Sequence, residues 1–308
     1  MKHHLPDLES AIAAIDLAEC QEVDWPRVQR SVYLIHQHLG YAYPGPIQNL
    51  QQRLVILPPQ QHGDQHLIDH RLEVTHPSAD TAYHTDAFGN TEIISSAPSV
   101  QRAIEFEAWI LVERHADRGP HYLPAHTLLD ERYTQPSRLT QADKALSTIA
   151  TQFKSGGKQG LELAHQINTW VYQTMNYAHD VTDIHTTAAE ALTLQRGVCQ
   201  DYAHIMLTLC RLCALPARYV SGHLLGEGGT HAWVEVLLPV DNHPEVALVV
   251  ALDPTHGRQA GITYVTVAVG RDYFDVAPTS GTYFAACSGQ LSARKRVGLT
   301  MYEYAETA

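Results

Sequence analysis

The pattern of apolar positions divides the chain into a first part with the spacing of strands and a second part that contains helices. Over 100–112, every second residue lies on one face, and all members of that face except Arg102 are apolar. A spacing of two is typical of a strand with one buried face, so this segment predicts a half-buried antiparallel strand. Similar short runs, cut by proline, glycine and glutamine-rich breaks, occur throughout the first part. We therefore expect an all-β region over 28–119.

After a proline-marked stretch the spacing becomes helical. Segment 161–177 predicts one helix, and the capping-box pattern Thr-Ala-Ala-Glu that begins at Thr187 predicts the start of another. A further helix is expected after Gly197. It is about fifteen residues long, because Pro216 ends it. Two β-type runs, 231–240 and 246–255, follow a glycine-rich loop. The second part is thus expected to contain both helices and strands.

Composition and charge narrow the class of protein. Of the 308 residues, 44% are hydrophobic and 18% are charged, a balance that argues against disorder. Lysine and arginine number 21 against 33 aspartate and glutamate residues, which gives a formal net charge of −12. An acidic chain without a basic run predicts that no nucleic acid is bound. No apolar stretch reaches the roughly 18 residues that a membrane span needs, so no membrane partner is expected.

The cysteines and the N-terminal residues bear on location. Five cysteines, at 20, 199, 210, 213 and 287, have an odd count and uneven spacing that do not suggest a disulfide framework. Acidic residues interrupt the N-terminal segment, where a signal peptide needs an apolar stretch. We therefore expect a soluble, cytoplasmic protein with reduced thiols.

Cys199 is the cysteine whose position suggests chemistry. It follows Gly197 at the start of a predicted helix, where unpaired N–H groups and the positive end of the helix dipole favour a thiolate. Cys210 and Cys213 lie in the middle of the same helix. We interpret them as core packing, because no second pair of ligands at zinc spacing accompanies them.

A nucleophilic cysteine needs a base, and position selects one from the 20 histidines. His231 begins a predicted strand directly after the glycine-rich loop, and Asp253 ends the next one. If the two strands form a hairpin centred on residue 242, the two side chains are opposite one another on one face, with Cβ atoms about 5 Å apart. Asp253 would then orient the imidazole toward Cys199. A surface histidine and an Asp-Pro turn are the plainer interpretations of each residue alone, but the three together suggest a catalytic set.

Three segments, GVCQDYAHIMLTLCRLCALPARYVSG, THAWVEV and LDPTHG, carry Cys199, His231 and Asp253 in that order. They resemble the core of the transglutaminase-like superfamily, in its bacterial cysteine-protease-like branch. The first region, with YAYPGPIQNLQQRLVILPP and TDAFGN, is similar to the N-terminal β domain found with that core. The resemblance covers roughly residues 30–285, and it is specific because three separate motifs occur in the order found in the family.

The resemblance implies an α+β fold with a papain-like core, in which the helix that carries the cysteine packs on an antiparallel sheet. Together with the patterns above, it predicts four parts. They are an N-terminal extension with a short helix at 1–27, a β-rich domain at 28–119, a linker at 120–136 and a transglutaminase-like catalytic core at 137–308.

The implied chemistry is acyl transfer through a thioester on Cys199. The leading hypothesis is a hydrolase of amide or peptide bonds, whose substrate is a peptide, a protein or a small amide. One alternative is a transamidase that joins a glutamine carboxamide to an amine, and another is a non-catalytic binding module. The sequence leaves the substrate and the oligomeric state open.

Other residues near these motifs are weaker candidates. Gln195 and Tyr177 are candidates for a second oxyanion donor, although Gln195 equally suits a turn. Trp233 is a candidate shield over the His–Asp pair, although a core aromatic is the simpler interpretation. The glycine-rich loop at 226–229 suggests either a mobile lip or a turn. No cofactor and no metal are expected, because no EF-hand or zinc motif is visible.

Overall fold

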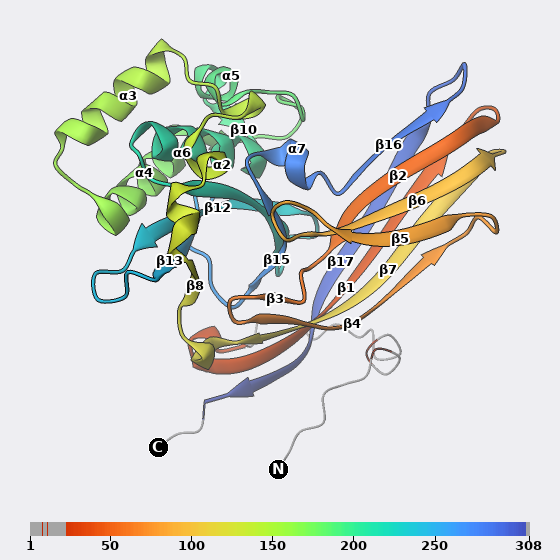
Figure 1. Cartoon of the computed structure of the whole chain (residues 1–308), viewed down its shortest axis with the longest axis horizontal. Coiled ribbons are helices and arrows are strands. Elements are labelled where there is room, and N and C mark those ends of the chain that lie inside the picture. Colours follow the sequence, from red (N-terminus) through yellow and green to blue (C-terminus); the bar gives the residue numbers. More distant parts are fainter. Residues whose placement is uncertain (1–7, 9–10, 12–22, 306–308) are drawn as a thin grey trace.

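The computed structural model describes Leu8, Ala11 and residues 23–305. These first two residues are helical and buried, and the remainder of the helix expected over 8–19 lies outside the described residues, as does Cys20. The described part is an α+β fold of two units that lie side by side, a β-sandwich and a sheet covered by helices (Figure 1).

The first unit is a sandwich of two antiparallel sheets. One sheet has the strand order β17-β1-β7-β4-β3, and the other has the order β16-β2-β6-β5. Apolar side chains from the facing sides of both sheets, among them Ile35, Leu54 and Phe106, form one core. The strands are β1 (Val28–Ala42), β2 (Ile47–Leu57), β3 (Gln61–His62), β4 (Gln65–Val74), β5 (Asp80–Thr85), β6 (Thr91–Val100), β7 (Ala103–His115), β16 (Thr279–Phe284) and β17 (Gln290–Tyr304).

Strand β7 shows how the alternating pattern places this core. Alternate residues from Ile104 to Val112 are buried between the two sheets, as the spacing of two predicts. Trp109 and Leu111, on the opposite face, are buried as well and pack in a smaller cluster that includes Leu8. The expectation of a half-buried strand is therefore wrong for the second half of β7, where both faces are covered.

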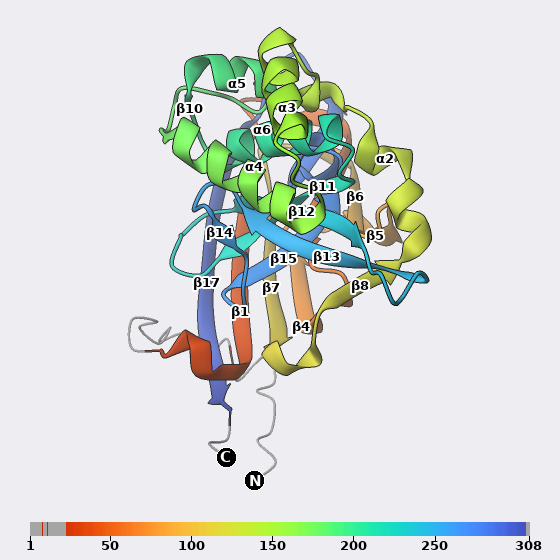
Figure 2. The same cartoon turned by 90° about the vertical axis from the view of Figure 1, so that its left-hand side faces the viewer.

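The second unit is an antiparallel sheet with helices on one face, as the two views show (Figures 1 and 2). The strand order is β14-β13-β12-β11-β15, and β8 also pairs with β13. The strands are β8 (His121–Pro124), β11 (Ala217–Leu224), β12 (His231–Pro239), β13 (Val246–Asp253), β14 (Arg258–Gln259) and β15 (Tyr264–Gly270). The helices are α2 (Glu131–Thr134), α3 (Lys144–Ser155), α4 (Gly160–Thr174), α5 (Ala188–Leu194), α6 (Cys199–Leu212) and α7 (Tyr273–Val276). Two short strands, β9 (Asn176–Tyr177) and β10 (Arg196–Gly197), pair with one another in parallel.

Helix α6 is the centre of this unit. Its residues Met206 and Leu209 pack in one core with Ala232 and Val234 of β12. The predicted packing of the cysteine-bearing helix on an antiparallel sheet is confirmed. None of the helices in the described part of the chain is long and apolar enough to cross a membrane.

The chain crosses between the two units more often than the sequence suggested. Strands β16 and β17 pair with β2 and β1 of the sandwich, so the expected catalytic core at 137–308 is wrong at its C-terminal end. Strand β8, inside the expected linker at 120–136, pairs with β13 of the second unit. The reason is that β1 needs a partner for its outer backbone groups, and β17 supplies it over nearly its whole length.

Candidate active site

Cys199 is the first residue of α6, and the turn before it is held by a side-chain cap. The Asp201 carboxylate accepts the Val198 N–H at 2.8 Å and the Thr182 hydroxyl at 2.7 Å. Gly197 lies against this carboxylate so closely that a Cβ at that position would clash with it. The local sequence therefore fixes where the helix begins, and Cys199 stands at its N-terminus with its side chain half-buried.

His231 and Asp253 meet at the ends of neighbouring strands. The Nε2 atom of His231 and the Oδ2 atom of Asp253 are 2.8 Å apart. Val234 is opposite Leu252, so the hairpin is centred on residue 243, and Asp253 is a diagonal neighbour of His231 and not the residue opposite it. The predicted centre at 242 is wrong by one residue. The two side chains still share a face because that error moves the partner by two positions.

The electrostatics of this pair favour a charged imidazole. Burial by itself would lower the pKa of His231, but hydrogen bonds with Asp253 and Cys199 outweigh burial and raise this pKa to about 10. For Asp253, burial would raise the pKa, yet the hydrogen bonds from His231 and His256 hold it far below its usual value. His231 is thus an imidazolium at neutral pH. Because Asp253 occupies Nε2, the hydrogen bond between His231 and Cys199 is left to Nδ1.

Asp253 has further partners besides His231. Its Oδ2 atom also faces His256 Nδ1 at 2.8 Å and accepts the Tyr264 hydroxyl at 2.7 Å. The backbone N–H of Thr255 donates to Oδ1 at 2.8 Å. His256 lies in the segment LDPTHG, so its closeness to Asp253 in sequence was the available signal, whereas Tyr264 arrives from the next strand.

Glu227 of the glycine-rich loop lies over the two histidines. Its carboxylate oxygens are 3.4 Å from His231 Nδ1 and 2.8 Å from His256 Nε2. The loop therefore brings a carboxylate to the imidazole nitrogen that faces Cys199. The glycines of this loop are recognisable in the sequence as a turn or a mobile lip, whereas the position of Glu227 beside the histidines appears only in the fold.

Trp233 lies beneath His231 on the same face of β12. The two rings are stacked, with centroids 6.1 Å apart and planes inclined by 27°, and Trp233 is 1% exposed. The rings of Trp233 and Tyr264 meet edge to face, with centroids 5.4 Å apart. Trp233 is thus a buried core aromatic that also contacts His231, and its role as a cover for the His231–Asp253 pair stays a prediction.

The structure gives the two oxyanion candidates different positions. Tyr177 pairs with Gly197 across the β9–β10 ladder, and its neighbours include Cys199 and Glu227. Burial raises the pKa of its hydroxyl, and the charges of Cys199 and Glu227 raise it further. Gln195 ends α5 in a left-handed conformation, and its side chain is exposed and makes no hydrogen bond within the described part of the chain.

The remaining described cysteines have structural positions. Cys210 is buried and Cys213 is half-buried in the core around α6, and burial raises the pKa of both thiols. Cys199, Cys210, Cys213 and Cys287 are all free. The interpretation of Cys210 and Cys213 as core packing is confirmed.

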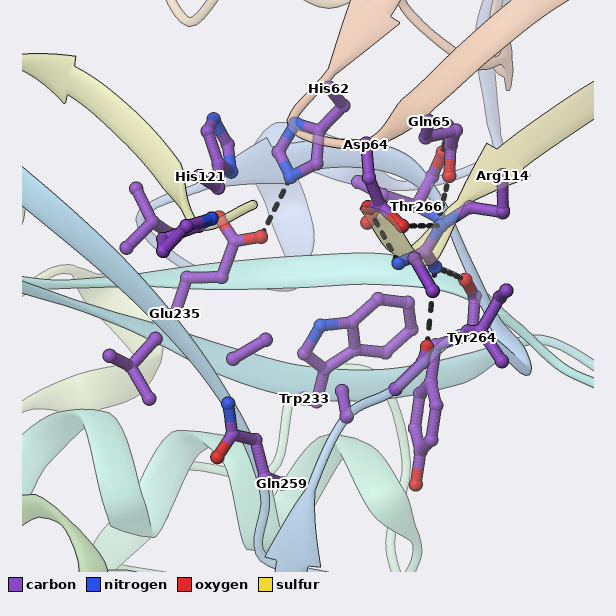
Figure 3. A pocket seen from close by; sticks show the side chains of 18 of the residues that line it. His62, Asp64, Gln65, Arg114, His121, Trp233, Glu235, Gln259, Tyr264 and Thr266 are labelled. Atoms are coloured by element: carbon purple, nitrogen blue, oxygen red, sulfur yellow. Dashed lines mark hydrogen bonds and ion pairs between the residues drawn. The ribbon is translucent and has the colours of Figure 1, made fainter. Parts of the chain in front are cut away.

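A cavity of about 490 Å³ lies behind the site, on the face of the second sheet that is turned toward the sandwich (Figure 3). Trp233 and Tyr264, which contact the His231–Asp253 pair from one side, line this cavity from the other. Two groups in the described residues have the donor atoms for a metal ion. One is His231, Asp253 and His256, and the other, at the cavity, is His62, His121 and Glu235.

Two family models match the chain. A model described as the transglutaminase-like superfamily matches residues 147–245, and one described as a bacterial transglutaminase-like N-terminal region matches residues 33–113. The first match includes Cys199 and His231 and ends before Asp253, and the second covers most of the sandwich strands that precede the helices.

One solved structure is similar to this chain in fold, and two relatives are similar to it in sequence. A crystal structure of a candidate cysteine protease from Cytophaga hutchinsonii has a TM-score of 0.71 at 20% identity, and covers 91% of this chain and 94% of that chain, which shows a shared fold. An uncharacterised Mycobacterium leprae protein is 36% identical over 124 residues, 37% of this chain and 42% of that protein, so the match spans less than half of that relative. An uncharacterised Mycobacterium bovis protein is 25% identical over 253 residues, 74% of this chain and 80% of that protein.

Proposed function

Because this chain belongs to the transglutaminase-like superfamily, we propose that it is a cysteine-dependent acyl-transfer enzyme that hydrolyses amide bonds through a thioester on Cys199. The observation that carries the proposal is the 2.8 Å contact between His231 Nε2 and Asp253 Oδ2. This contact leaves the other imidazole nitrogen for the thiol at the start of α6. Nucleophile, base and orienting acid are the three roles that such an arrangement supplies.

In the first half of the reaction, the imidazolium of His231 stabilises the Cys199 thiolate. The thiolate attacks the carbonyl carbon of the amide, and the tetrahedral intermediate collapses as the C–N bond breaks. His231 donates its proton to the leaving amine, and a thioester remains on Cys199. Asp253 keeps the imidazole in the orientation that this proton transfer requires, because its carboxylate fixes Nε2.

In the second half, neutral His231 takes a proton from water as the water oxygen attacks the thioester. The C–S bond breaks, the carboxylic acid leaves, and the thiolate and imidazolium are restored. Solvent reaches the neighbourhood of Cys199, since the side chain of Glu227 is 43% exposed and Tyr177 is 51% exposed. An open site of this kind favours water over an amine that needs its own channel.

The developing oxyanion needs hydrogen-bond donors. The backbone N–H of Cys199 belongs to the first turn of α6, where N–H groups have no partner within the helix, and it is the first donor. We propose the Tyr177 hydroxyl as the second, because the backbone of Tyr177 pairs with Gly197 and the charge of Cys199 acts on this hydroxyl. The Gln195 side chain supports this role less, since it is exposed at the end of α5.

The test is product analysis with a glutamine-containing peptide and a primary amine at millimolar concentration. We expect hydrolysed product to predominate in the mass spectrum, and a trapped acyl group to map to Cys199. The variant C199A loses both. The matched control C287S, which removes a free half-buried thiol that packs with the sandwich core, keeps both.

Two outcomes would contradict the proposal. A Cys199-dependent amine adduct as the main product would make the protein a transamidase. No turnover across peptides and small amides, together with alkylation of Cys199 by iodoacetamide no faster than that of Cys287, would favour a binding module.

A further inference from the structure

We propose that His62, His121 and Glu235 form a zinc site, separate from Cys199 and in addition to the acyl-transfer function. The three residues come from β3, β8 and β12, so no local sequence motif marks them. One donor atom from each residue lies within 4.8 Å of the others. Figure 3 shows the three side chains together at one end of the cavity, with Trp233 below them.

The side chains are close to the geometry that zinc requires. His62 Nε2 is 2.7 Å from Glu235 Oε1, and the ring centroids of His62 and His121 are 4.6 Å apart with planes at 72°. Ligand atoms at about 2.0–2.1 Å from a tetrahedral zinc ion lie about 3.4 Å from one another. A small opening of the His62–Glu235 contact and a small inward turn of His121 would satisfy this geometry.

The backbone is shaped so that the two imidazoles can approach. Gly63 follows His62 with a φ of +57°, in the left-handed region that favours glycine. A Cβ on Gly63 would lie 3.0 Å from both Cβ and Cγ of His121. Glycine at this position therefore lets the β3 turn of the sandwich press against β8 of the other unit, which brings His62 and His121 together.

The contacts of the three side chains suit metal binding. His121 is half-buried, and within the described part of the chain its ring makes no hydrogen bond and has only an edge contact with the ring of His62. Glu235 is 3% exposed, and its carboxylate contacts His62 and Arg218. His121 thus offers a ring nitrogen and Glu235 a buried oxygen to an ion, and binding through His62 Nε2 would replace its present contact with Glu235.

Arg218 and the cavity complete the site. Arg218 Nε donates to Glu235 Oε2 at 2.7 Å, which orients the carboxylate and leaves Oε1 for the ion. The cavity of about 490 Å³ beside the three residues has room for a water molecule as fourth ligand. Two imidazoles, one carboxylate and a water suit zinc among the divalent metals. Such an ion would join the sandwich to the second sheet.

The test is metal titration of the full-length chain with a C199S background, so that no thiolate at the active site takes part. After chelation and dialysis, Co²⁺ is added as an optical probe and then displaced by Zn²⁺. We expect one equivalent of Co²⁺ with the visible bands of nitrogen and oxygen ligation, and a rise in melting temperature on Zn²⁺ addition. H62A and H121A should bind roughly 100-fold more weakly or not at all, and lose that rise.

Matched variants separate this site from others. H66A removes a histidine from the β3–β4 hairpin, and H256Q removes a metal-donor atom from the group around Asp253. Both variants should still bind one equivalent of Co²⁺. H62Q, whose amide can still donate to Glu235, serves if H62A does not fold. Equal binding by H62A, H62Q and H121A, loss of binding in H256Q, or no binding by the parent chain at micromolar metal would each overturn the proposal.

Discussion

At the scale of single residues, one carboxylate organises the polar groups around Cys199. The Oδ2 atom of Asp253 contacts His231, His256 and Tyr264 within 2.8 Å. Asp253 has no exposed surface, so these partners have no competition from solvent. Removal of the Asp253 charge should therefore alter the reactivity of Cys199 through its effect on His231.

The variant D253N should retain Cys199 and lose most of the activity. An amide cannot hold the His231 imidazolium as a carboxylate does, so we expect amide hydrolysis to fall roughly 100- to 10,000-fold. NMR titration of the imidazole should show the pKa of His231 below the wild-type value of about 10. Y264F removes one donor and keeps the charge, so it should have a much smaller effect. Equal losses in D253N and Y264F would contradict the role given to the charge.

The same pair predicts how stability depends on pH. The folded pKa of His231 is raised to about 10, so protonated His231 stabilises the fold fully below about pH 6.5, the value for an unfolded histidine. This contribution is lost as the pH rises from there toward about 10. The stability difference between wild type and D253N, from urea unfolding, should therefore be largest near pH 6 and shrink toward pH 10. A difference that grows over this range would have the wrong sign.

Glu227 adds a second charge at the same place. Its carboxylate competes with the Cys199 thiolate for the proton-bearing Nδ1 of His231, at 3.4 Å. E227Q should therefore speed alkylation of Cys199 at neutral pH, by about two- to fivefold because the side chain is partly exposed. E245Q, which alters an exposed Glu–His pair with His243, is the control and should change nothing. Slower labelling in E227Q would show instead that this carboxylate assists the thiolate.

Sequence position was enough to select three residues that the fold brings together, but not their neighbours. Cys199, His231 and Asp253 each stand at the end of an element, and such ends are visible in the chain. Tyr264 reaches Asp253 from β15, and Glu227 reaches His231 from a loop, through contacts that exist only once the sheet is formed. These contacts depend on tertiary packing, which a pattern of apolar positions does not encode. The assignment of roles to all five stays a prediction.

At the scale of elements, the start of α6 depends on close packing behind it. In G197A the added methyl would meet the Asp201 carboxylate that caps the helix. We expect the free energy of unfolding to fall by about 1–3 kcal/mol, as in other overpacked sites, and Cys199 to be alkylated more slowly. Chemical denaturation and timed labelling measure both. G228A is the control, since nothing lies within 4 Å of its added Cβ. Equal stability of the two variants would count against the close packing.

The hairpin of β12 and β13 shows which part of an element the sequence determines. Alternation fixes the face of each residue, so the shared face of His231 and Asp253 was predictable. The register was not, because it depends on how the loop between the strands closes, and the observed centre is residue 243. The error changed an opposite pair into a diagonal pair without separating the two side chains.

At the scale of the whole molecule, the two units are interleaved. The chain builds most of the sandwich, passes through the helices and second sheet, and returns to complete both sandwich sheets with β16 and β17. The sequence showed where the spacing changes from two to the helical period, which is the first crossing. It could not show the return, since β16 and β17 have the same strand-like pattern whichever sheet they join. The cytoplasmic location and the peptide or amide substrate stay predictions.

This interleaving predicts how fragments of the chain behave. A fragment of residues 137–308 has β17 without β1 and lacks β8, so it exposes strand edges and apolar residues such as Leu299, which is buried in the whole protein. We expect it to be mostly insoluble. A fragment of residues 120–278 keeps β8 on β13 and omits β16 and β17, so its soluble fraction should be larger, although Val265 of β15 loses its cover in the sandwich core. Soluble yield and the rate of Cys199 alkylation, each compared with the full chain, measure the difference. If the 137–308 fragment is soluble and its Cys199 reacts as fast as in the full chain, β17 is dispensable and the two units separate at the boundary that the sequence suggests.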